Sequence, residues 1–165
     1  MKKQQPDEGI KLKGMFRIHL TEDGKVVGDS GWTRNTITGN GFNQYLCLAL
    51  AGNTGSKSVS HIALANGTAA ISSTFTSSSM TGEFAKRTTV TAASSSTSKT
   101  VRFTGSFSSN AASTANFQNS SANTLASVGL WNSSSGGTMF AGNTFSSSTI
   151  GTNQSVTFTY DIIFN

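Results

Sequence analysis

Charge is missing from about a third of this 165-residue chain. Between Phe103 and Tyr160 there is no Asp, Glu, Lys, Arg or His. Acid–base catalysis, metal ligation and nucleophile activation mostly need a titratable side chain with a tuned pKa, and this stretch offers only Tyr160, at its end. We therefore expect it to be architecture, with a surface of Ser, Thr and Asn that packs against other surfaces without burying charge.

Proline, cysteine and long apolar runs are scarce as well. The chain has one Pro and one Cys, so no intrachain disulfide forms, and its 11 Phe residues supply much of the core. The apolar surroundings of Cys47 predict a buried side chain. No apolar run reaches the length of a membrane span, and the first 20 residues lack the apolar centre of a signal peptide. We therefore expect folding in the cytoplasm and no membrane partner.

Basic residues outnumber acidic ones, 12 to 7, for a net charge of +5. Such an excess favours anionic partners, but most basic residues are scattered singly and no nucleic-acid-binding motif is present, so nucleic acid is not an expected partner. Positive charge is concentrated only at the start of the chain, at Lys2, Lys3, Lys11 and Lys13. Because no apolar periodicity precedes Met15, residues 1–14 are predicted to form an extended N-terminal arm. This arm is either a frayed terminus or a segment that lies across a neighbouring subunit, with its lysines against carboxylates.

Residues 15–165 predict a single all-β domain. Apolar and polar residues alternate from Met15 to Leu20, and the dipeptide Asp23-Gly24 then predicts a tight hairpin turn. The same alternation ends the chain, with Val156, Phe158, Tyr160, Ile162 and Phe164 on one face. Further strands are expected at 25–32, 59–64, 84–91, 99–107, 125–131 and 138–145. Short strands separated by turn residues predict an antiparallel β-sandwich, jelly-roll-like in architecture.

One short α-helix, near residues 41–51, is predicted to interrupt this series of strands. Asn40 is the candidate N-cap, and Gly52 follows as the C′ residue. Apolar residues recur at offsets of three and four, at Phe42, Tyr45, Leu46, Ala49 and Leu50. This spacing predicts one buried stripe that plugs the sandwich.

Residues suited to catalysis or metal binding are few. After Asp29, the chain has only one histidine, His61, and two acidic residues, Glu83 and Asp161. The other histidine is His19. No HxH, HExxH or G-x-S-x-G spacing is present. A carboxylate pair for glycoside hydrolysis would have to come from Asp23 and Asp29, and the hairpin turn already explains Asp23. We expect no catalytic residue, no metal and no cofactor.

The segment at residues 83–87 (EFAKR) places one acid near two bases. Two interpretations are open. The charges either lie on a solvated strand edge, where they discourage unwanted pairing, or form a salt bridge between subunits. On the second interpretation, Glu83, Lys86 and Arg87 join the four lysines of the arm as candidate partner-binding residues.

A family resemblance rests on the order of several segments. These are residues 32–42 (WTRNTITGNGF), 61–67 (HIALANG), 83–87 (EFAKR), 127–131 (SVGLW) and 136–145 (GGTMFAGNTF), followed by the closing alternating strand. Over residues 15–165 the chain resembles small virion proteins of tailed bacteriophages, of the kind found as capsid decoration (cement) proteins or as tail and fibre components. The Ser/Thr-rich stretches near 72–81 and 108–124 are longer than in that pattern.

The resemblance implies a non-enzymatic virion structural protein, assembled in the host cytoplasm. The first expectation is a decoration protein that binds the major capsid protein or other virion proteins and forms a closed homo-oligomer, such as a trimer. The alternative is a tail or fibre module that binds a host receptor or glycan, with Trp32, Trp131 or Phe140 stacked on sugar rings. A hydrolase of cell-wall or capsule polymer is a third hypothesis, against which the shortage of paired carboxylates argues.

Overall fold

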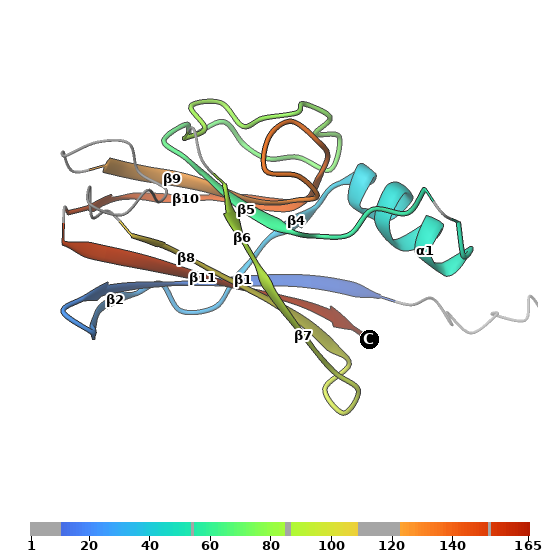
Figure 1. Cartoon of the computed structure of the whole chain (residues 1–165), viewed down its shortest axis with the longest axis horizontal. Coiled ribbons are helices and arrows are strands. Elements are labelled where there is room, and N and C mark those ends of the chain that lie inside the picture. The colour runs from blue at the N-terminus through green and yellow to red at the C-terminus, as the bar shows by residue number, and fades with distance from the viewer. Residues whose placement is uncertain (1–10, 54, 85–86, 109–122, 152) are drawn as a thin grey trace, which may run out of the picture.

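Two antiparallel sheets pack face to face in the computed structural model of the chain, which describes residues 11–53, 55–84, 87–108, 123–151 and 153–165 (Figure 1). The first sheet contains β1 (Leu12–Glu22), β2 (Lys25–Asp29), β3 (Thr33–Arg34), β7 (Thr91–Ser95), β8 (Thr100–Ser108) and β11 (Gln154–Phe164). The second contains β4 (Thr36–Ile37), β5 (His61–Ala65), β6 (Thr88–Thr89), β9 (Asn123–Trp131) and β10 (Met139–Ile150). The strand orders are β2-β1-β11-β8-β7, with β3 also beside β1, and β4-β10-β9-β5-β6. The predicted all-β antiparallel sandwich is confirmed.

The two strands with the clearest alternation lie side by side in the middle of the first sheet. β1 pairs with β11 along its whole length, from Leu12 opposite Phe164 to Glu22 opposite Gln154. Pairing begins at Leu12, so residues 12–14 belong to the sheet and the predicted arm of residues 1–14 is too long at its inner end. Residues 1–10 lie outside the described residues.

The predicted hairpin turn at Asp23-Gly24 is present. Both residues have positive φ, 47° and 74°, as a two-residue type I′ turn requires, and Glu22 pairs with Lys25 across it. The return strand is shorter than predicted and ends at Asp29, because the left-handed backbone at Gly31 (φ 64°) interrupts it before β3.

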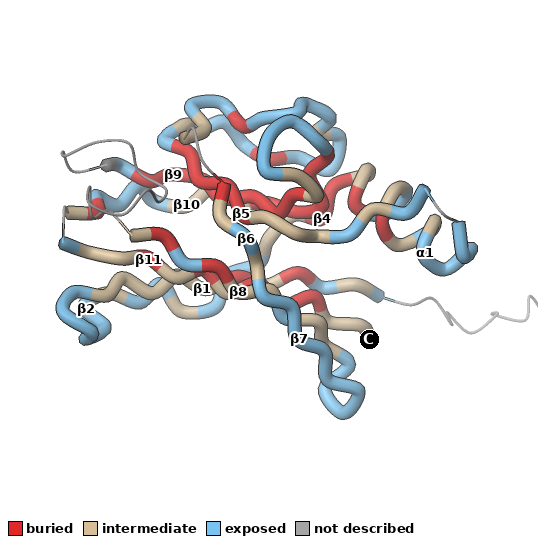
Figure 2. Tube along the Cα trace, in the orientation of Figure 1, coloured by how far each residue is buried: buried red, intermediate tan, exposed pale blue. Residues whose placement is uncertain are grey.

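The core lies between the sheets, and Figure 2 shows buried residues on strands of both. The first sheet contributes Phe16, Phe107, Val156, Phe158, Tyr160 and Ile162, and the second contributes Ile62, Leu64, Val128, Leu130, Phe140 and Ile150. Each large side chain removed from water stabilises the fold by about 1.5–3 kcal/mol. Phe16 stacks on Tyr160 with ring centroids 5.8 Å apart, which joins the two central strands across their inner face.

The loop between β5 and β6 forms a further layer on the outer face of the second sheet. Ala63, Trp131 and Met139 point away from the main core and form a second apolar cluster with Ile71 and Met80 of this loop. Figure 1 shows the loop above β5 and β9. The Ser/Thr-rich stretch near 72–81 is thus a cover for one sheet, while most of the stretch near 108–124 lies outside the described residues.

The predicted helix is present, but its N-terminal cap and its hydrogen-bond pattern differ from the prediction. It runs as a π-helix, η1 (Gly41–Cys47), and then as one turn of α-helix, α1 (Leu48–Leu50). Asn40 is not the cap, since its own backbone is helical and its side chain makes no capping hydrogen bond. The Thr38 hydroxyl instead accepts the Gly41 N–H at 2.9 Å. Gly52 has a φ of 63°, as the predicted C′ residue requires.

The predicted buried stripe of this helix is mostly wrong. Tyr45 is buried, but Phe42 and Leu50 are 41 % and 84 % exposed. Cys47, predicted to be buried, is exposed too. Hydrogen bonds in a π-helix join residues five apart, so each turn is wider than in an α-helix and side chains spaced by three no longer share a face.

Candidate binding face

The outer face of the first sheet is the candidate site. Because side chains alternate along a strand, the residues between the core positions of β1, β11 and β8 point to this face. They include Arg17 and His19 on β1, Thr157 and Thr159 on β11, and Thr104 on β8. These residues are partly exposed, whereas the β5–β6 loop packs on the outer face of the second sheet.

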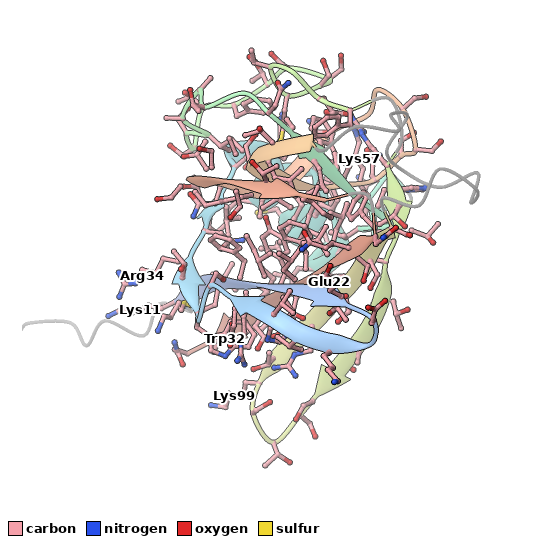
Figure 3. All side chains as sticks on the ribbon, turned by 90° about the vertical axis from the view of Figure 1, so that its left-hand side faces the viewer. Lys11, Glu22, Trp32, Arg34, Lys57 and Lys99 are labelled. Carbon is pink, nitrogen blue, oxygen red and sulfur yellow. The ribbon has the colours of Figure 1, made fainter. Side chains whose placement is uncertain are left out.

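Basic residues that are scattered in the sequence gather on and around this face. We name as the basic face Lys13, Arg17, Arg34 and Arg102, with Lys11 and Lys99 at its end and Trp32 among them. Figure 3 shows Trp32 and Lys99 below the first sheet, with Lys11 and Arg34 at one end. Two acidic side chains of the same face, Asp29 and Asp161, accompany these six basic ones. Basic residues that are scattered along the sequence are thus close together in the folded chain.

The first of two Arg–Asp pairs on this face joins Arg17 of β1 to Asp29 at the end of β2. Arg17 Nε donates to Asp29 Oδ1 at 2.9 Å, and its Nη2 donates to Oδ2. The Gly31 N–H donates to the same carboxylate at 2.9 Å. The hydrogen bonds from Arg17 and Gly31 hold the pKa of Asp29 well below its usual range. His19 Nε2 lies 3.6 Å from Asp29 Oδ1, at the margin of this pair.

The second pair places a cation beside the exposed indole. Arg102 Nε and Nη2 each donate to Asp161 at 2.7 Å, a bidentate geometry that raises the pKa of Arg102. The Arg102 guanidinium carbon lies 5.6 Å from the centre of the Trp32 ring. Trp32 is 42 % exposed, so its remaining surface is available to a ligand. A fixed arginine beside an aromatic ring is a preorganised surface for acidic or planar groups.

The arrangement of paired arginines beside an exposed indole suits binding. Among the described residues, no three His, Cys, Asp or Glu side chains are close enough to hold a metal ion. His19 lies on the first sheet and His61 on the second, where burial lowers the pKa of His61. A cavity of about 630 Å³ between the sheets has a mostly apolar lining that includes Ile18, Leu125 and Phe145, with Asp29 as its only charged residue. In the described part of the chain no helix is long and apolar enough to span a membrane.

Two of the predicted partner-binding residues make an internal salt bridge. Arg87 Nε donates to Glu83 Oε1 at 2.7 Å, and the Arg87 side chain is only 2 % exposed. Its other nitrogens donate to the carbonyls of Ser78, Ser133 and Gly136 at 2.6–3.0 Å. The guanidinium also lies 3.8 Å from the centre of the Trp131 ring. The Glu83–Arg87 pair therefore does not lie on a solvated strand edge. Arg87 is also not a free surface for a partner, because it is enclosed by the β5–β6 loop and the turn after Trp131.

The other predicted contacts divide into those on the basic face and those elsewhere. Lys11 and Lys13 lie on it, at the end of β1. Lys2, Lys3 and Lys86 lie outside the described residues. Of the three aromatic residues proposed to stack on sugars, Trp131 and Phe140 are core residues, 0 % and 3 % exposed, which leaves Trp32.

Sequence reasoning missed Arg17, Arg34 and Arg102 as a group. The signal was present in part, since the alternation that puts Phe16 inside also puts Arg17 outside. Their proximity, however, depends on β1, β3, β11 and β8 being neighbours. No protein-family model, no curated protein and no solved structure matches the chain, so its function is argued from its own residues.

Proposed function

We propose that this chain is a non-enzymatic virion structural protein, a capsid decoration protein that lays its basic face on an acidic capsid surface. The observation that carries the proposal is the gathering of six basic side chains and an exposed Trp on and around the outer face of the first sheet. Complementary charge steers association and fixes orientation, which suits a protein that must add to a preformed shell.

The two faces of the sandwich differ in a way that supports one-sided docking. The outer face of the second sheet is closed by the β5–β6 loop, which the buried Arg87 ties to the turn after Trp131. On the outer face of the first sheet, Thr and Ser hydroxyls separate the charges. Ser106 and Thr157, for example, share a 2.8 Å hydrogen bond between neighbouring strands. Such a face makes many polar contacts without a deep cleft.

Mixing the purified protein with expanded, undecorated capsids of the parent phage tests the proposal. The wild-type protein should co-sediment with them in a fixed stoichiometry, more weakly at higher salt. The double variant Lys13→Glu/Arg34→Glu should bind about tenfold more weakly or worse, since reversing two exposed charges removes on the order of 1.4 kcal/mol.

Lys25→Glu is the matched control, because Lys25 is exposed at the opposite end of the first sheet, beside the hairpin turn. It should bind capsids as the wild type does. Equal binding by the double variant and the wild type would exclude the basic face as the docking surface. A labelled single-stranded oligonucleotide forms a separate arm, in which tight binding would favour a nucleic-acid partner over the capsid.

The exposed indole favours a second candidate, the receptor- or glycan-binding tail or fibre module. Trp32 has a sugar-sized aromatic face beside an arginine–carboxylate pair that offers donors and acceptors to hydroxyls. On this reading the protein binds host cells or glycans, and Trp32→Ala abolishes that binding. Phe42→Ala is the matched control, since Phe42 is equally exposed on the helix. Absence of wild-type binding to host cells and glycans would rule this candidate out.

A further inference from the structure

The edge strand β7 (Thr91–Ser95) has backbone hydrogen-bonding groups on the side away from β8 that no described strand pairs with. It ends the strand order of the first sheet, and within the described residues only β8 pairs with it. All five of its residues are exposed, which Figure 2 shows as a continuous pale blue strand. Its sequence, TAASS, contains no charge, no proline and no large side chain. An edge strand of this kind is a template for a further strand.

Besides β7, the strands that end the two strand orders in the described part of the chain are β2, β4 and β6, and all three are protected. β2 carries Lys25 and Asp29 at its ends, and its register with β1 shifts between Leu20 and Thr21. β4 and β6, which end the strand order of the second sheet, are only two residues long. Beyond Gly142, β10 extends past β4, and there its register with β9 shifts between Thr144 and Ser148. Charges, register shifts and short length are the usual devices against edge pairing, and β7 has none of them.

We propose that two copies of the chain associate by antiparallel pairing of β7 with β7, across a two-fold axis normal to the first sheet at Ala93. In this register Ala93 faces Ala93 of the second copy, Ala92 faces Ser94, and Thr91 faces Ser95. Every facing pair is small and neutral, so the strand is complementary to itself. The first sheets of the two copies become one continuous sheet.

Charge on the neighbouring strand does not oppose this pairing. Arg102 of β8 is the cross-strand neighbour of Ala93 and lies on the outer face. Three strand spacings separate it from Arg102 of the second copy, about 14 Å, which exceeds the screening length of about 8 Å at physiological ionic strength. Each Arg102 is also paired with its own Asp161.

A second copy fits this edge better than an unrelated strand does. Nothing on β7 selects a foreign sequence, because it offers no charge and no large side chain for specific recognition. A two-fold contact requires only self-complementarity, which the small neutral residues supply.

The symmetry has a consequence for binding. Antiparallel strands in one sheet place facing side chains on the same side, so the two basic faces point in the same direction. Two linked faces bind a repetitive surface with higher avidity than one. This consequence rests on the proposed function, whereas the pairing of β7 does not.

Sedimentation equilibrium of the full chain tests the pairing separately from any capsid. The wild-type mass should rise with concentration from the 17.2 kDa of one chain to twice that value. Ala93→Lys and Ala93→Glu should each remain at the mass of one chain, because like charges then face each other across the axis. An equimolar mixture of the two variants should regain the doubled mass, because Lys then faces Glu.

Val26→Lys and Val26→Glu are the matched controls, since Val26 is 61 % exposed on the edge strand β2. They should associate as the wild type does, and unchanged circular dichroism melting should show that all the variants fold. A wild-type protein that stays at the mass of one chain at every concentration would overturn the proposal. So would doubled mass in both Ala93 variants, or failure of their mixture to associate.

Discussion

The charged side chain of Arg87 is buried, and its contacts offset the cost of removing that charge from water. One guanidinium meets a carboxylate, three carbonyls and an indole ring, so four of its five N–H donors have hydrogen bonds inside the protein. The contacts tie the β5–β6 loop to the turn that follows Trp131. The short sequence EFAKR revealed the charges but not their burial, because burial depends on a loop that returns over the second sheet.

Arg87→Ala should therefore lower the free energy of unfolding by about 3–5 kcal/mol, since it leaves the Glu83 carboxylate, only 12 % exposed, without its cationic partner. Urea unfolding of the wild type and the variant measures the loss. Lys25→Ala, at an exposed position, should change stability by less than about 0.5 kcal/mol. A loss that small in Arg87→Ala would show that the cluster does not hold the loop.

The Arg17–Asp29 pair predicts a pH dependence. The folded-state pKa of Asp29 lies below its unfolded value of about 3.9. The ionised form is thus favoured by folding, so the stabilisation is fully present above pH 4 and is lost as the pH falls toward the folded-state pKa. Wild type and Asp29→Asn should differ most in melting temperature at neutral pH, and the difference should shrink below pH 4. A constant difference from pH 7 to pH 2 would contradict this assignment.

At the scale of elements, strands were predicted better than the helix. The period-two pattern near both termini identified β1 and β11 because their inner residues meet one apolar core. The helix was found, but its buried side was not, since the expected stripe assumed α-helical turns and residues 41–47 form a π-helix. The two-residue strands β3 and β4 were not predicted, because a two-residue strand has no period to detect.

The helix gives a direct comparison between two leucines. Leu50, predicted to be in the core, is 84 % exposed, while Leu130 of β9 is fully buried. Leu50→Ala should change the free energy of unfolding by less than about 0.5 kcal/mol, and Leu130→Ala should lower it by about 2–5 kcal/mol. Chemical denaturation of both variants distinguishes the observed packing from the predicted one. Similar losses in the two would mean that the helix does plug the sandwich.

At the scale of the whole molecule, the decisive feature is the difference between the two outer faces. The sequence predicted one sandwich domain and an uncharged architectural portion, and β9, β10 and most of β11 fall in that portion. It did not predict which face is open, because that depends on the neighbours of β1 and on the path of the β5–β6 loop. Both are long-range properties that no local pattern contains.

A cryo-electron microscopy reconstruction of capsids mixed with the protein would show which face of the sandwich meets the shell. We expect β1, β11 and β8 to lie against the capsid, with Arg34 and Trp32 at the contact and the β5–β6 loop pointing outward. Density in which that loop meets the capsid and the basic face is turned to solvent would contradict it.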